Sequence, residues 1–127
     1  MPWADWRAKG ELAVVHHVDG RDRVEYRIGQ VLYQSNGWIS HIRLSPQADK
    51  IAFINHSSLW DDRGAVYLLD LAGQAKILSP EYDSTDGLAW TLDGKEIWFT
   101  AARSGYTRSL LAVNPNGKIP FWRFLWG

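Results

Sequence analysis

The fold is decided by a stretch that reads Ile42-Arg43-Leu44-Ser45-Pro46-Gln47-Ala48-Asp49-Lys50-Ile51-Ala52-Phe53-Ile54. Its pattern returns as Leu88-Ala89-Trp90-Thr91-Leu92-Asp93-Gly94-Lys95-Glu96-Ile97-Trp98-Phe99-Thr100, and a degraded copy precedes both as Ala4-Asp5-Trp6-Arg7-Ala8-Lys9-Gly10-Glu11-Leu12-Ala13-Val14-Val15. Each copy is an apolar strand, a polar turn and a second strand rich in β-forming residues. Ile51 and Ile97 are equivalent, so the period is 97 − 51 = 46 residues, and the step from Leu12 to Ile51 is 51 − 12 = 39. Periods in this range are typical of β-propellers, in which each repeat is one blade of about four strands.

Two further strands complete each repeat. The third strands are predicted at 24–28, 66–71 and 110–114, and the fourth strands at 31–34, 75–78 and 119–124. Between them lie the turns Gly29-Gln30, Gly73-Gln74 and Gly117-Lys118, while the pairs Asp19-Gly20, Asn36-Gly37, Asp93-Gly94 and Asn116-Gly117 tolerate the positive φ that tight hairpins require. No segment has a helical period. The sequence therefore predicts an all-β chain, a single domain of three propeller blades (about 1–37, 38–84 and 85–127), each a four-stranded antiparallel sheet.

Composition excludes several classes of partner. The 127-residue chain has 14 basic and 14 acidic side chains, so no net field draws it to nucleic acid or to an anionic membrane. It has no cysteine, which excludes disulfides and thiolate zinc sites. We see no signal peptide and no run of about 18 apolar residues that could span a bilayer. We therefore expect an intracellular protein, with the cytoplasm favoured, that binds neither nucleic acid nor membrane.

The repeats also resemble a known family. The segments Ser45-Pro46-x-x-Asp49-Lys50-Ile51-Ala52-Phe53 and Trp90-Thr91-x-Asp93-Gly94-Lys95-Glu96-Ile97-Trp98-Phe99 are similar to the signature of TolB-like propeller repeats, relatives of the WD-repeat, as is Val66-Tyr67-Leu68-Leu69-Asp70-Leu71-Ala72-Gly73. The first repeat departs from this signature, with Arg7-Ala8-Lys9-Gly10 at its turn. The resemblance implies blades that commonly close as a ring of six, as in TolB-type proteins, peptidase propellers and the C-terminal sensor-like regions of bacterial serine/threonine kinases. It implies no catalytic residue, because the family shares none.

Three blades would cover half of a six-blade ring and leave two flanks open. We expect those flanks to expose apolar faces and strand edges that favour association. The expected partner is a second copy, in a homodimer that completes the ring; the alternatives are another closed ring or half of a longer protein. Trp6 and Trp90 are predicted to pack between blades, as is usual for aromatic residues at equivalent strand positions. The assembly interface is predicted in the tail strand, whose aromatic residues are Phe121, Trp122, Phe124 and Trp126; alternation places Trp122, Phe124 and Trp126 on one face.

Binding is predicted in the loops between the second and third strands, because these loops differ most between the repeats. The longest runs from Asn55 to Gly64, and its candidate contact residues are His56, Trp60, Asp61, Asp62 and Arg63. The loop of the third repeat adds Arg103 and Tyr106. The alternative is a solvated hairpin in which Trp60 folds back onto its blade.

Catalytic and metal sites find no support in the sequence. His16 and His17 are adjacent on a strand and point to opposite faces, while His41 and His56 have no fixed spacing to a third ligand. No nucleophile elbow, phosphate-binding loop or calcium loop is present. We therefore predict no catalytic residue, no metal and no cofactor. The predicted function is a non-enzymatic binding or scaffolding module for a protein or peptide, with a carbohydrate-binding propeller or a peptidase propeller fragment as the alternatives.

Overall fold

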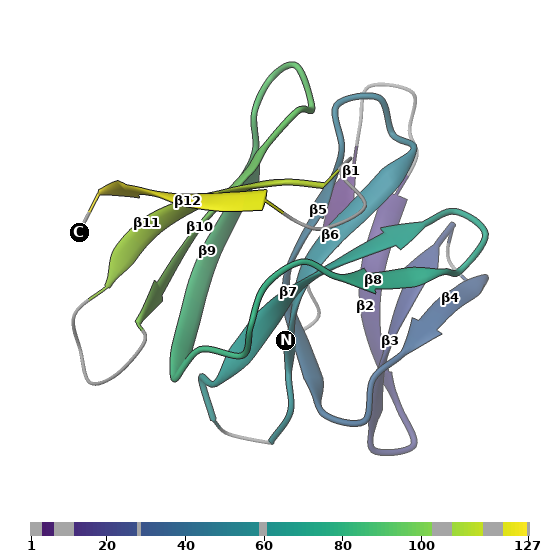
Figure 1. Cartoon of the computed structure of the whole chain (residues 1–127). Coiled ribbons are helices and arrows are strands. Elements are labelled where there is room, and N and C mark those ends of the chain that lie inside the picture. Colours follow the sequence, from purple (N-terminus) through teal and green to yellow (C-terminus); the bar gives the residue numbers. More distant parts are fainter. Residues whose placement is uncertain are drawn as a thin grey trace.

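The chain forms three antiparallel sheets of four strands each, arranged in sequence order (Figure 1). The computed structural model describes residues 4–6, 12–27, 29–58, 61–102, 108–115 and 121–126. Sheet A contains β1 (Ala4–Trp6), β2 (Leu12–Val18), β3 (Arg21–Tyr26) and β4 (Val31–Gln34). Sheet B contains β5 (Trp38–Leu44), β6 (Lys50–His56), β7 (Gly64–Asp70) and β8 (Ala75–Ile77), and sheet C contains β9 (Ser84–Trp90), β10 (Ile97–Ala102), β11 (Ser109–Asn114) and β12 (Phe121–Trp126). The described residues contain no helix, which confirms the predicted all-β class.

The predicted strands agree closely with the observed ones, and the differences have local causes. The start of β3 at Arg21, three residues before its predicted start, follows from a tight hairpin in which Asp19 and Gly20 have φ of 53° and 78°. By contrast, Asn36-Gly37 is no hairpin but the link between β4 and β5. Gly37 does not adopt a positive φ; it is required because a Cβ there would overlap the carbonyl oxygen of His56. The predicted turn at Gly117-Lys118 lies outside the described residues.

Sheet B lies between the other two sheets and buries both of its faces. Successive residues of β6 point to opposite faces, so Phe53 packs in the core shared with sheet A while Ala52 and Ile54 pack in the core shared with sheet C. Phe99 of β10, 99 − 53 = 46 residues after Phe53, fills the equivalent place in the second core. Each internal junction therefore buries a phenylalanine, 0% and 1% exposed.

The polar turn of the repeat is held by its own side chains. The Ser45 hydroxyl accepts hydrogen bonds from the backbone N–H groups of Asp49 and Lys50 and donates one to the Asp49 carboxylate. In sheet C the hydroxyl of Thr91 takes the role of Ser45 and accepts from the N–H of Glu96. The sequence pattern at these turns is thus a set of side-chain to backbone bonds that fixes the hairpin.

Trp90 packs between blades, as the sequence predicts. Its side chain contacts the core shared by sheets B and C, and its indole N–H donates to the carbonyl oxygen of Arg43 on β5 at 3.0 Å. The side chain of Trp6 lies outside the described residues, as do those of Phe121, Trp122, Phe124 and Trp126. The backbone of β12 pairs with β11, and the register shifts between Leu110 and Leu111.

The two open flanks of the array differ in chemistry. On the free face of sheet C, Trp98 is 40% exposed and neighbouring Leu92 is 97% exposed. On the free face of sheet A, His16 Nδ1 lies 2.9 Å from Glu25 Oε2, beside Val14. The expectation that both flanks are apolar therefore holds for sheet C at Trp98 and Leu92, whereas sheet A presents the polar pair of His16 and Glu25 next to Val14.

Candidate functional site

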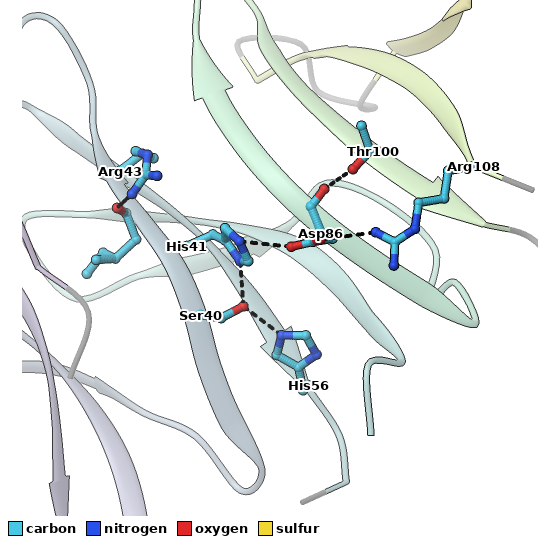
Figure 2. Close-up of polar contacts among 8 residues, drawn as sticks. Ser40, His41, Arg43, His56, Asp86, Thr100 and Arg108 are labelled. Atoms are coloured by element: carbon cyan, nitrogen blue, oxygen red, sulfur yellow. Dashed lines mark hydrogen bonds and ion pairs between the residues drawn. The ribbon is translucent and has the colours of Figure 1, made fainter. Parts of the chain in front are cut away.

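A row of polar side chains joins the first strands of sheets B and C, β5 and β9, which contact each other (Figure 2). His41 Nε2 of β5 lies 3.0 Å from Asp86 Oδ1 of β9. The other oxygen of the Asp86 carboxylate accepts a hydrogen bond from Arg108 at 3.2 Å, and the Thr100 hydroxyl donates to the Asp86 carbonyl oxygen. The side chains of Asp86 and Arg108 are 56% and 41% exposed, and that of His41 is 17% exposed. In this row (His41, Asp86 and Arg108), the carboxylate of Asp86 and the guanidinium of Arg108 are charges that are fixed and exposed to solvent.

The backbone at His41 explains how its imidazole reaches the neighbouring sheet. The pairing of β5 with β6 shifts between Ser40 and Arg43, and His41 has a φ of 54°. The pairing of β9 with β10 shifts at the equivalent place, where Gly87 has a φ of 73° and 87 − 41 = 46 is the repeat period. A histidine thus stands where the other repeat has glycine. Strained backbone of this kind concentrates at functional sites.

His41 is held by a series of polar contacts through Ser40 and His56, which we call the relay. The Ser40 hydroxyl oxygen is 2.9 Å from His41 Nδ1 and 2.7 Å from His56 Nε2, and His56 Nδ1 is 3.2 Å from the Arg63 carbonyl oxygen. The ring of His56 also stacks on Trp38, with centroids 3.7 Å apart. Burial is the main effect on both imidazoles and lowers the pKa of His41 and of His56, although Asp86 acts to raise the first. Both rings are therefore neutral at pH 7.

Proton counting shows how this relay is shared. Four contacts link the Arg63 carbonyl, His56, Ser40, His41 and Asp86, whereas one hydroxyl and two neutral imidazoles supply three protons. An additional proton would complete the chain, but the burial of both rings opposes it. The neutral relay therefore has three protons for its four contacts. Its role is to hold the His41 and His56 rings in position.

The order serine, histidine, aspartate is not a nucleophilic triad here. Ser40 is 2% exposed, so its hydroxyl does not meet a substrate, and His56 takes the second contact of that oxygen. No group of three or more metal-ligating side chains occurs within the part of the chain that the structure describes. The arrangement can orient charges for recognition, and it offers no attacking group.

The predicted contact loop is anchored beside the same row. Trp38 donates its indole N–H to the carbonyl oxygens of Ser58 and Asp61, and the Thr85 N–H donates to that of Asp62. Asp62 and Arg63 are exposed and Asp61 is partly exposed. His56, in contrast, is 1% exposed, so the imidazole that the sequence placed on the contact surface lies beneath it.

Three predicted contact residues, Trp60, Arg103 and Tyr106, lie outside the described residues. Sequence reasoning missed His41, Asp86 and Arg108, since none belongs to a chemical motif. The detectable signal was the repeat itself, because aligning the copies places His41 opposite Gly87.

The loop end of sheets B and C is the end at which β6 is followed by β7 and β8 by β9, and its described residues are predominantly acidic. Its described carboxylates are Asp61, Asp62, Glu81, Asp83 and Asp86, and its guanidinium groups are Arg63 and Arg108, which gives 2 − 5 = −3. Arg63 is 3.9 Å from Glu81 and 4.0 Å from Asp83, so its charge is already shared. The chain as a whole carries no net charge, so the acidity of this end is local.

Comparison with known proteins places the fold. No family model matches the sequence, and no curated protein matches it. Among solved structures, the chain is similar to TolB from Agrobacterium tumefaciens, with a TM-score of 0.64 and 19% identity over 87% of this chain and 40% of that one. The chain has the fold of TolB-like β-propeller blades.

Two further structures agree with the TolB-like fold. TolB from Acinetobacter baumannii has a TM-score of 0.59 and 19% identity over 87% of this chain and 26% of that one. The β-propeller domain of the Trilobed protease from Pyrococcus furiosus has a TM-score of 0.57 and 15% identity over 94% of this chain and 37% of that one. The chain therefore spans less than half the length of each of these three structures. None of its described residues forms a helix long and apolar enough to cross a membrane.

Proposed function

We propose that this chain is a non-enzymatic propeller module that binds a protein or peptide segment at the loop end of sheets B and C. The observation that carries the proposal is the row of His41, Asp86 and Arg108, in which exposed charges are fixed by partners on two different sheets. Groups held in this way lose little freedom when a ligand binds, which favours recognition. In a longer protein the module would serve as an interaction or sensor portion.

The charge of this end favours ligands with lysine or arginine side chains. Two of the five carboxylates, Asp61 and Asp62, belong to the anchored loop, and the Asp86 side chain is 56% exposed although two partners already contact it. Opposite charges across an interface steer encounter and select partners. We therefore expect a cationic peptide segment to bind here in preference to an acidic one.

The test measures fluorescence anisotropy with labelled nine-residue peptides, one library rich in lysine and arginine and one rich in glutamate. We expect binding by members of the basic library, weakened at least about tenfold in Asp86→Asn and in Asp62→Asn. Asp86→Asn keeps an oxygen for His41 but removes the negative charge and the second oxygen, which accepts from Arg108. The matched control is Asp93→Asn, at the opposite end of the sheets, which should bind as the parent does.

The outcome that contradicts the proposal is equally concrete. Basic peptides that bind the parent, Asp86→Asn and Asp62→Asn equally would place the site elsewhere, and an absence of binding from both libraries would remove the peptide ligand.

Carbohydrate binding has less support. A sugar site repeated around a propeller should place tryptophan in equivalent loops, where indole rings can stack on sugars. Trp38 instead stacks on His56, and Trp90 donates to the Arg43 carbonyl. The likeness to a protease propeller domain, at 15% identity, concerns the fold.

A further inference from the structure

The two internal junctions of the chain follow one pattern of large and small residues. In the core between sheets A and B, Ala13 of β2 belongs with Phe53 of β6. In the core between sheets B and C, Ala52 of β6 belongs with Phe99 of β10. The positions are equivalent, since 52 − 13 = 39 and 99 − 53 = 46 are the two repeat spacings. Each junction thus combines alanine from one sheet with phenylalanine from the next.

On the free face of sheet C, a large residue stands at the position that alanine occupies in the two internal junctions. The position equivalent to Ala13 and Ala52 is Trp98, since 98 − 52 = 46. Its neighbours in β10, Ile97 and Phe99, are buried toward sheet B, so Trp98 points to the free face and is 40% exposed. With Ala89, Trp90 and Leu92 it lines a hollow of about 430 Å³. This flank carries a large aromatic residue where the internal junctions carry alanine.

On the free face of sheet A, a smaller residue stands at the position that phenylalanine occupies in the two internal junctions. The position equivalent to Phe53 and Phe99 is Val14, since 53 − 14 = 39. Its neighbours Ala13 and Val15 are buried toward sheet B, at 0% and 3% exposed, so Val14 points to the free face. This flank carries a smaller residue where the internal junctions carry phenylalanine.

The buried carboxylate of the sheet A flank already has hydrogen-bond partners. Glu25 pairs with Val14 across the strands, and its side chain is only 4% exposed. One carboxylate oxygen lies 2.9 Å from His16 Nδ1, and the other accepts from the N–H of Gly29 at 2.8 Å. Covering this flank would therefore leave no unpaired carboxylate, which is the main obstacle to burying a charged group.

We infer that the free flank of sheet C docks on the free flank of sheet A of a second copy, with Trp98 against Val14. The docking continues the two junctions that the chain already contains, with the large and small residues exchanged between the sheets. A two-fold axis then forms the same contact twice, and six sheets close a ring, which is within the usual range of 4–8 blades.

The test is the mass of the protein by light scattering after size exclusion, over a concentration series. We expect 2 × 14.5 = 29.0 kDa for the parent. Trp98→Ala and Val14→Glu should each give the single-chain mass of 14.5 kDa with unchanged circular dichroism. Trp98→Ala combined with Val14→Phe recreates the internal alanine–phenylalanine pair and should restore the dimer. The matched control, Ile77→Glu at a 58% exposed position of the outer strand β8, should stay dimeric.

Three outcomes of the light-scattering experiment would contradict this docking of sheet C on sheet A. A parent that stays at single-chain mass up to about 0.5 mM, well above the Kd of a stable dimer, overturns the inference and leaves the flanks to further blades of a longer chain. A dimer that survives both Trp98→Ala and Val14→Glu uses another surface. A mass that rises beyond two copies without a plateau indicates open, head-to-tail association and also overturns the closed ring.

Discussion

Replacing Ser40 with alanine should destabilise the chain far more than the same change at Ser84. The Ser40 hydroxyl is 2% exposed and bridges two imidazoles, whereas the Ser84 hydroxyl is buried with no hydrogen-bond partner in the described part of the chain. Both changes remove one oxygen from a β-strand, so they form a matched pair.

The size of the effect follows from what each change leaves behind. Ser40→Ala strands His56 Nε2 in a site that is 1% exposed, and a buried polar atom without a partner costs about 1–3 kcal/mol. The contact of Ser40 with His41 Nδ1 is not counted as a second lost hydrogen bond, because the Ser40 hydroxyl has a single proton to donate. We expect a loss of about 1–3 kcal/mol for Ser40→Ala and about 0 for Ser84→Ala, which removes an oxygen that nothing satisfies.

The assay is reversible urea unfolding followed by circular dichroism, at one fixed protein concentration. A loss of about 3 kcal/mol corresponds to a fall in Tm of roughly 10 °C for a chain of this length. If the two variants lie within about 0.5 kcal/mol of each other, the relay does not stabilise the fold and the reasoning is refuted.

Two further predictions concern the same region. Gly37→Ala should lower the free energy of urea unfolding by more than about 3 kcal/mol, because its Cβ would overlap the His56 backbone. The control Gly20→Ala has open space around its Cβ and should lose only about 1–2 kcal/mol through its positive φ. Equal losses in the two variants would contradict the close approach at Gly37. Burial lowers the pKa of His56 below 6.5, so the unfolded chain binds more protons in acid and the free energy of unfolding should fall as the pH drops below about 6.5; a slope that His56→Asn leaves unchanged would assign the effect elsewhere.

Much of the fold was predictable because the repeat combines strand pattern and turn chemistry. Val31–Gln34 is observed with the predicted bounds, and Ser45 and Thr91 hold their turns through side-chain bonds that the repeated motif indicates. Gly37 was interpreted as a hairpin residue because glycine after asparagine is typical of tight turns. Glycine is also needed where two backbones approach closely, and the contact of Gly37 with the His56 carbonyl is visible only in the folded chain.

The site was less predictable, because its members come from distant segments. His41 and Asp86 meet only when two blades pack, and neither lies in a chemical motif. His56 has the residue type of a surface ligand, yet its place at the end of β6 buries it beneath the loop. Residue type and loop length predict where contacts gather, whereas the direction of each side chain depends on the packing of the sheets.

The positive φ shared by His41 and Gly87 has a consequence for how such arrays diversify. Duplication of a blade copies the register shift and positive φ of its first strand, a backbone conformation that glycine adopts without strain. Exchanging that glycine for an imidazole costs about 1–2 kcal/mol locally and leaves every strand in place. One repeat can thereby carry an imidazole at this position while another carries glycine, with a positive φ in both.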